Sequence, residues 1–293
     1  MNPVLLKEFR QRWRTFKTPL IIFLYLLVVG VIAWFVMFQE VSRQGYLPIG
    51  SSSDLFLALS LLQMGLIAFV APGLTAGSVS GERERQTLSV LLTTQLSPAS
   101  IVVHKLLSSI VFIVLLIVAT LPVYAVVLLY GGVSPLQLLG TFGMMILLIL
   151  FCGSFGVLCS VWSKRTSVST VITYGCLFVF LAGAPLLSTL TEDWFLHGMR
   201  YPNHPFVQNN PFVHSLPVIF EGISPPMMLI HMFHPRQFPT TGVEGLAINY
   251  WIQNPWPIFL ITLPVLIILF VLLSIYLLHP VRPKIAWRKR SAV

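Results

Sequence analysis

The chain has 293 residues, of which 56% are hydrophobic and 9% are charged, and its mean hydropathy is +0.86. Soluble domains carry roughly 25% charged residues, so a water-soluble fold is excluded and the lipid bilayer must be the solvent of most of the chain. The net charge is +9. Because the basic residues flank apolar segments, this charge indicates contact with a membrane surface, and we expect no nucleic-acid partner.

The first predicted element is an amphipathic helix over residues 2–18. Asn2 and Pro3 are typical of a helix start. One face is apolar and the opposite face is basic, with the pattern carried by Leu5, Lys7, Phe9, Arg10, Trp13, Arg14 and Phe16. Such a helix lies in the interface of the membrane and contacts its lipids. The alternative is a basic flank that serves only as a topology signal.

Six apolar segments then reach the roughly 20 residues that a helix needs to cross a bilayer. They cover residues 20–38, 55–76, 106–130, 136–162, 168–190 and 258–278. None of them contains Asp, Glu, Lys or Arg. Ion-coupled carriers and intramembrane metalloproteases place ionisable groups in their spans, so this pattern counts against both classes. All three cysteines fall in these segments, and we expect them to behave as small apolar residues.

Residues 81–98, GERERQTLSVLLTTQLSP, connect the second and third spans. Glu82 and Glu84 would lie in the first turn of a short helix over 81–97, where the helix dipole favours acids, and Glu82 could pair with Arg85. An apolar stripe follows at Leu88, Leu91 and Leu92. This pattern suits docking into a groove of another protein, and it suits equally a helix that rests on the membrane.

The fourth span carries small residues four positions apart, at Cys152, Gly156 and Ser160. Small residues at this spacing allow close helix packing. The partner could be another helix of this chain or a second subunit.

Residues 191–257 separate the fifth and sixth spans and hold ten prolines between positions 202 and 257. Positions 212–233 are apolar enough for a seventh span, but Glu221, Pro217 and Pro225-Pro226 interrupt them. We therefore expect short interfacial or re-entrant helices here. Five of the seven histidines lie in this segment, at His197, His204, His214, His231 and His234. Their spacing matches no strong metal-ligand signature, and no metal site is predicted.

The distribution of charge predicts the orientation. Fifteen of the 18 Lys and Arg residues lie before the first span, in the second and fourth connections, and in the tail at 279–293. Six of the nine acids lie on the opposite side. The positive-inside rule therefore places both termini and the 81–97 segment in the cytoplasm, and residues 191–257 outside.

The run from Gly81 to Ser97 resembles the segment that follows the second span in ABC-2 type transporter permeases. In that family a Gly-Glu-Arg-Glu run precedes Thr-Leu and Leu-Leu-x-Thr, although proline often stands where this chain has Gln95. The opening from Asn2 to Arg12 and the six-span layout are also similar, and Asn210-Pro211-Phe212 is a weaker likeness. The resemblance implies an all-α polytopic fold with an interfacial helix, a coupling helix and external re-entrant helices.

The resemblance also implies a function. The chain would be the permease subunit of an ATP-driven exporter in the cytoplasmic membrane of a prokaryote. It would act beside a second permease half, identical or different, and two copies of an ABC ATP-binding subunit. By position, the docking residues would be Gly81, Glu82, Arg83, Glu84, Arg85, Thr87, Leu88, Leu91, Leu92 and Thr93.

We expect no catalytic site and no cofactor in the chain itself. It has no G-x-x-x-x-G-K-[ST] loop to hold phosphates, so the partner subunit would bind ATP and Mg²⁺. The rival interpretation is a membrane assembly factor or receptor subunit that transports nothing. An ATPase gene beside this one would favour transport.

Overall fold

The computed structural model describes residues 17–44, 51–88, 97–129, 132–200, 211–235 and 254–279. Nearly all of the predicted interfacial helix, including its seven pattern residues, lies outside these ranges, as do residues 280–293 of the tail. The described part of the chain is helical and contains no strand. The all-α fold is therefore confirmed.

Six described helices are long and apolar enough to cross a membrane. They are α2 (Lys17–Gln44), α3 (Ser51–Thr75), α6 (Pro98–Leu129), α7 (Pro135–Trp162), α8 (Thr166–Arg200) and α13 (Pro255–Leu278). Each of the six predicted spans lies in one of them to within a residue. The six long apolar helices expected from the lengths of the apolar segments are thus confirmed.

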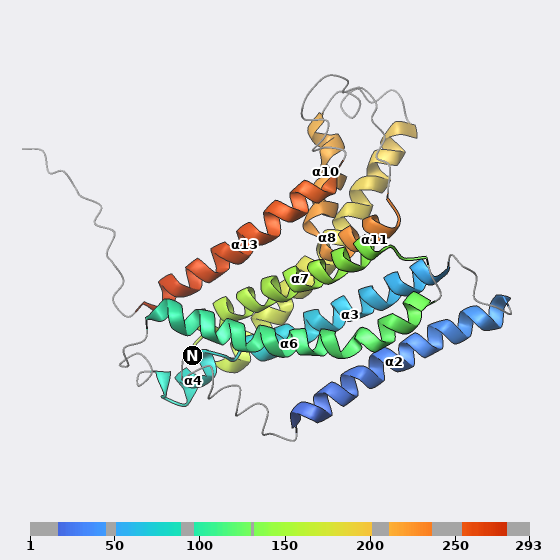
Figure 1. The fold of residues 1–293 in the computed structure, drawn as a ribbon. Helices are drawn as coiled ribbons and strands as arrows, with labels where there is room; N and C mark the ends of the chain where they lie inside the picture. The colour runs from blue at the N-terminus through green and yellow to red at the C-terminus, as the bar shows by residue number, and fades with distance from the viewer. Residues whose placement is uncertain are drawn as a thin grey trace, which may run out of the picture.

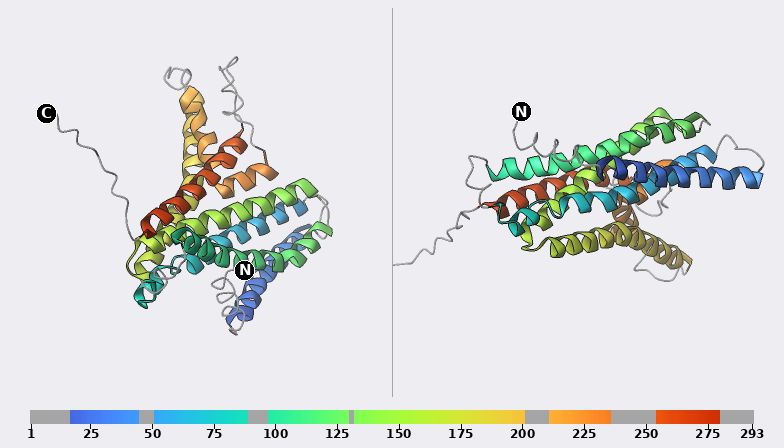
Figure 2. Two further views of the ribbon diagram at one scale, coloured as in Figure 1. Left: turned by 60° about the vertical axis from the view of Figure 1, so that its left-hand side comes forward. Right: turned by 90° about the horizontal axis from the view of Figure 1, so that it is seen from below.

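Helix α7 is the centre of the bundle. Of its apolar window, 72% is buried, against 17% in α2, α8 and α13. It packs against α3, α6, α8 and α13, whereas α2 contacts α3 and α6 at the edge (Figure 1). Seen from below, α8 and α6 lie on opposite sides of the bundle (Figure 2). Ser134 begins α7 with a reciprocal cap, in which its hydroxyl accepts from Gln137 N and its own N–H donates to Gln137 Oε1.

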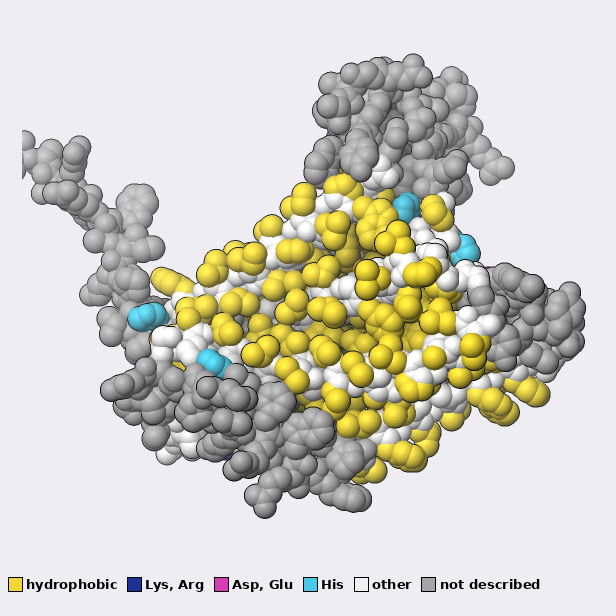
Figure 3. All heavy atoms as spheres, in the orientation of Figure 1, with side chains coloured by type: hydrophobic (Ala, Val, Ile, Leu, Met, Phe, Trp, Pro, Cys, Tyr) yellow, Lys and Arg dark blue, Asp and Glu magenta, His cyan; other side chains and the backbone are white. Residues whose placement is uncertain are grey.

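The outer surface of the bundle is apolar. Large hydrophobic side chains such as Phe23, Phe178 and Leu269 are more than half exposed. Figure 3 shows one face on which hydrophobic side chains cover almost the whole described bundle. In water such a surface would be strongly unfavourable, so this face contacts lipid. Cys152, Cys159 and Cys176 are free thiols.

Two short helices, α10 (Pro211–Ile223) and α11 (Pro225–Phe233), form a bent pair at one end of the bundle. The chain bends by 103° between them, so the pair is a broken span or a re-entrant loop. Ser224 caps α11, and Pro225 fits its first turn. Gly222 permits close packing on α13, because a Cβ there would lie 2.8 Å from Ile258 Cβ and 2.9 Å from the Pro255 carbonyl oxygen. The prediction of short helices in this segment is confirmed.

Candidate functional site

The Gly-Glu-Arg-Glu run forms α4 (Ser80–Glu84), a five-residue helix that follows α3. It lies at the end of the bundle where α6 and α8 begin and α7 and α13 end, opposite the α10–α11 pair (Figures 1 and 2). An apolar cluster holds this end together, formed by Val79, Leu88, Ile101, Val102, Leu106, Val157, Val161 and Leu278. We call α4 with the side chains that contact it the α4 hub.

The N-terminus of α4 is capped by a residue of another helix. Val79 stands at the N-cap position and has no side-chain oxygen to offer. Instead, the Ser160 hydroxyl of α7 accepts from Val79 N and Ser80 N, each at 2.9 Å. These contacts satisfy two of the backbone donors that every helix start leaves free. They fix α4 to the last turn of α7.

Arg83 binds the C-terminus of the same helix. Its Nη1 donates to the Ser163 carbonyl at 2.8 Å and its Nη2 donates to the Val161 carbonyl at 3.1 Å. The last carbonyls of a helix have no partners within it and carry partial negative charge, and the planar fork of arginine suits two of them at once. Arg83 is therefore directed into the chain.

Glu84 binds the N-terminus of α8. Its two carboxylate oxygens accept from Thr166 N at 2.8 Å and from Thr166 Oγ1 at 2.9 Å. A carboxylate at this position compensates the free N–H groups of a helix start. The side chain of Glu84 is exposed, so α4 and α8 are joined at the surface.

Glu82 forms an ion pair with Lys105 of α6. The sequence suggested Arg85 as its partner, and that expectation is wrong. Lys105 is 23 positions further along the chain, and helix packing rather than local spacing brings it to Glu82. Glu82, Arg83 and Glu84 thus each bind a different helix, namely α6, α7 and α8.

The helix predicted over 81–97 is not continuous, because it is interrupted after Glu84, and residues 89–96 lie outside the described ranges. Thr87 N donates back to the Glu82 carbonyl at 2.9 Å, and Gln86 has a φ of 58°, a left-handed conformation that stops α4. Arg85, Gln86 and Thr87 are exposed, whereas Leu88 is only 8% exposed and belongs to the apolar cluster. Three other predicted docking residues, Leu91, Leu92 and Thr93, lie outside the described residues.

The small residues of α7 contact the same chain. Cys152 is fully buried, and Ser160 caps α4. Gly156 lies against the end of α3, where a Cβ would be 2.0 Å from Thr75 Oγ1. Gly81 lies near Thr166, because a Cβ added at Gly81 would be 3.8 Å from Thr166 Oγ1. The small-residue face therefore brings α3, α4 and α7 together.

Three partners of the charged run were not predicted, namely Lys105, Thr166 and Ser160. Two of them had a local signal. Lys105 is the last basic residue before an apolar span, and Thr166 follows Lys164-Arg165 at a helix start. Nothing local indicated that Ser160 would cap a helix eighty positions earlier in the chain.

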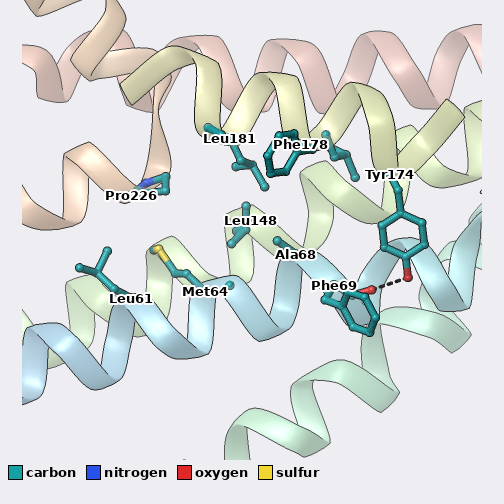
Figure 4. A pocket seen from close by; sticks show the side chains of 12 residues that line it. Leu61, Met64, Ala68, Phe69, Leu148, Tyr174, Phe178, Leu181 and Pro226 are labelled. Carbon is teal, nitrogen blue, oxygen red and sulfur yellow. Dashed lines mark hydrogen bonds between the residues drawn. The ribbon is translucent and has the colours of Figure 1, made fainter. Parts of the chain in front are cut away.

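A cavity of about 350 Å³ opens between α3, α7, α8 and α11 (Figure 4). Its lining is almost entirely apolar and comes from Leu61, Met64, Gly65, Ala68, Phe69, Leu148, Tyr174, Leu177, Phe178, Leu181, Ala182 and Pro226. The Tyr174 hydroxyl donates to the Phe69 carbonyl at 2.7 Å. Its hydrogen is thereby used within the chain, and the cavity suits an apolar group.

Among the residues that the structure describes, no group of three His, Cys, Asp or Glu side chains could hold a metal. His231 lies beside Glu221, and His234 lies beside Asp54. The side chains of the other three histidines of this segment, His197, His204 and His214, lie outside the described ones.

A family model described as "ABC-2 family transporter protein" matches residues 2–279, nearly the whole chain. No curated protein matches it at a significant level.

Proposed function

Because the chain belongs to the ABC-2 family of transporter proteins, and so is a membrane subunit that works with an ATP-binding partner, we propose that the α4 hub transmits the motion of that partner to the spans. The observation that supports this proposal is the division of contacts within one short helix. Glu82, Arg83 and Glu84 hold α6, α7 and α8 respectively. A displacement of α4 therefore acts on three helices together.

The exposed turn from Arg85 to Thr87 is the surface we propose for docking of the ATPase subunit. It follows α4 directly in the chain. Its side chains are exposed, whereas those of Arg83 and Leu88 on either side of it point into the protein. The polar residues predicted to touch the ATPase thus divide into two groups. The contact with the ATPase subunit is made by Arg85 and Thr87. The displacement of α4 is transmitted to the spans by Glu82, Arg83 and Glu84.

The α4 end is the cytoplasmic end in this proposal. It carries five basic residues, Arg83, Arg85, Lys105, Lys164 and Arg165, against the two acids Glu82 and Glu84, whereas Asp54 and Glu221 belong to the opposite end. That asymmetry follows the positive-inside rule. Two ATP-binding subunits, which hold ATP and Mg²⁺, would close beneath two permease halves in a prokaryotic cell membrane and drive export.

Charge reversal at Arg85 tests the docking surface. We expect Arg85→Glu to lower recovery of the ATPase subunit severalfold when the tagged chain is purified from its native membranes in mild detergent. The change replaces a positive by a negative charge in the proposed contact, and this charge would be repelled by, or left without a partner on, the ATPase subunit. The buried contacts of the α4 hub stay intact. Mass spectrometry of the co-eluting proteins measures the recovery.

Lys164→Glu is the matched control, with the same charge change in an exposed connection at the same end. Equal loss in both variants would indicate a general charge effect and would contradict docking at Arg85. A wild-type preparation with no ATPase in several detergents would instead favour the non-transporting assembly factor or receptor.

The apolar cavity is the space we propose for an apolar part of the substrate. Gly65 lines it, and a Cβ at Gly65 meets no atom within 4 Å, so a side chain at this position has free space at its base. We expect Gly65→Trp to reduce transport severalfold in proteoliposomes and to leave ATPase recovery unchanged. Gly143→Trp, at an exposed glycine with the same free space, should preserve transport. Undiminished transport by Gly65→Trp would remove the cavity from the substrate path.

A further inference from the structure

The α10–α11 pair buries two ionisable side chains. Glu221, on the last turn of α10, is 1% exposed, and His231, on α11, is 7% exposed. His231 Nδ1 and Glu221 Oε1 lie 3.1 Å apart, at ion-pair distance but without the alignment of a hydrogen bond. The second carboxylate oxygen of Glu221 has no hydrogen-bond partner among the described residues. A buried carboxylate in this state is costly unless its partner is charged.

The described side chains around Glu221 offer little other charge. Helices α3, α7, α8 and α13 pack against α10 or α11. Among their described side chains the one carboxylate is Asp54, which lies beside His234, and there is no Lys or Arg. Their other titratable groups are Cys152, Cys159, Tyr174, Cys176 and Tyr276. His231 is therefore the described residue that can balance the charge of Glu221.

We propose that Glu221 and His231 form a proton-binding site that sets the angle of the α10–α11 pair. The imidazole takes one proton from the surrounding water, and the pair changes from a net charge of −1 to neutral. Histidine is the side chain that gains or loses its charge between about pH 5 and pH 8. Lower pH therefore favours the bent arrangement, and higher pH leaves a buried carboxylate uncompensated.

The geometry couples this site to the bundle. Ser224 alone separates α10 from α11, so attraction between Glu221 and His231 acts directly across the 103° bend. Helix α10 packs on α8 and α13, whereas α11 packs mainly on α3 and α7 and less extensively on α8 and α13. A change in the bend consequently shifts one set of spans relative to the other. The site is at the end opposite α4, and the proposal does not depend on ATPase docking.

The chain contains an exposed pair that serves as a control. His234 Nε2 lies 3.0 Å from Asp54 Oδ1, and the two side chains are 58% and 66% exposed. Exposed ion pairs contribute little because water screens them. The same type of pair therefore occurs in a buried form on α11 and in an exposed form at the residue that follows α11, with the two histidines three positions apart.

Hydrogen–deuterium exchange of the full chain in lipid nanodiscs tests the site. The exchange of residues 225–233 is compared with that of a peptide from α7 at each pH, which cancels the intrinsic dependence of exchange on pH. In the wild type we expect the relative opening of α11 to rise about tenfold from pH 5 to 8, because loss of the imidazole proton leaves the buried carboxylate without a charged partner. His231→Asn keeps a donor near the position of Nδ1 and should abolish this dependence. His234→Asn should retain it.

Glu221→Gln provides a second and sharper test. Without the carboxylate, a proton on His231 is a buried and unpaired charge, so the dependence on pH should change sign. This variant also tests the proposal if His231→Asn does not fold, which faster hydrogen–deuterium exchange of its α7 would show. The proposal is overturned if wild-type α11 shows no dependence on pH relative to α7. It is equally overturned if the dependence survives in His231→Asn, or keeps its sign in Glu221→Gln.

Discussion

Replacing Arg83 by glutamine is expected to uncouple the transporter while its ATPase subunit still binds. The variant loses both contacts from the guanidinium to the Ser163 and Val161 carbonyls. Hydrogen bonds to charged groups contribute about 1.5–3 kcal/mol each, so the link between α4 and α7 should weaken substantially. Transport in proteoliposomes should fall by about tenfold or more, because 1.4 kcal/mol corresponds to a factor of ten.

Two further variants separate this effect from docking. Arg85→Gln removes the same charge from an exposed position two residues away, and it should lower ATPase recovery without loosening the hub. Arg83→Lys keeps the charge, but a single ammonium cannot reproduce the planar fork that reaches two carbonyls, so only partial rescue is expected. Full transport and normal thermal stability in Arg83→Gln would contradict the proposal that Arg83 transmits motion from α4 to α7. Loss of the ATPase subunit from Arg83→Gln would instead place Arg83 in the docking contact.

The acids of α4 cannot make this distinction equally well. Reversal of Glu82 and Glu84 to lysine would break the pair with Lys105 and the cap of α8 together. It would also change the charge that an incoming subunit meets. Weak ATPase association in that double variant would therefore have two causes. Arg83 and Arg85 separate them, because one side chain is directed into the chain and the other is exposed.

The spans were predictable because their signal is local. The length of an apolar segment decides whether it crosses the bilayer, and α7 needed no more than the run from Leu136 to Trp162. The bent pair was also predictable, since Pro225-Pro226 ends one helix and begins another, and Glu221 makes a plain span unfavourable. In each case the residues that decide the structure are neighbours in the sequence.

The partners of α4 were not predictable, because they depend on packing between distant segments. Local spacing suggested Arg85 as the ion-pair partner of Glu82, whereas in the folded chain the partner is Lys105. Thr166 is 82 positions from Glu84, and no periodicity within either helix relates them. The resemblance to the family indicated that the charged run is functional. It did not indicate that most of its charges are bound within the chain.

Gly156→Ala is expected to be among the most destabilising single substitutions in the described core. The added Cβ would lie 2.0 Å from Thr75 Oγ1 and 3.0 Å from Thr75 Cβ. Thr75 has little freedom to move away, since it is fully buried and its hydroxyl donates to the Ala71 carbonyl at 2.8 Å. Overpacking of this kind costs about 1–3 kcal/mol and sometimes more. We expect a lower thermal midpoint and a lower yield of folded protein.

Rescue at Thr75 identifies the cause. Thr75→Ala removes the 2.0 Å contact of Gly156→Ala but keeps the one at 3.0 Å, so it should restore stability in part. Thr75→Gly removes both, and glycine is tolerated at the last residue of α3. Gly143→Ala is the control on the same helix, with no atom within 4 Å of the added Cβ, and it should be neutral or slightly stabilising because alanine favours helix. Equal destabilisation by Gly143→Ala, or no rescue from either change at Thr75, would show that close packing of α3 on α7 does not explain Gly156.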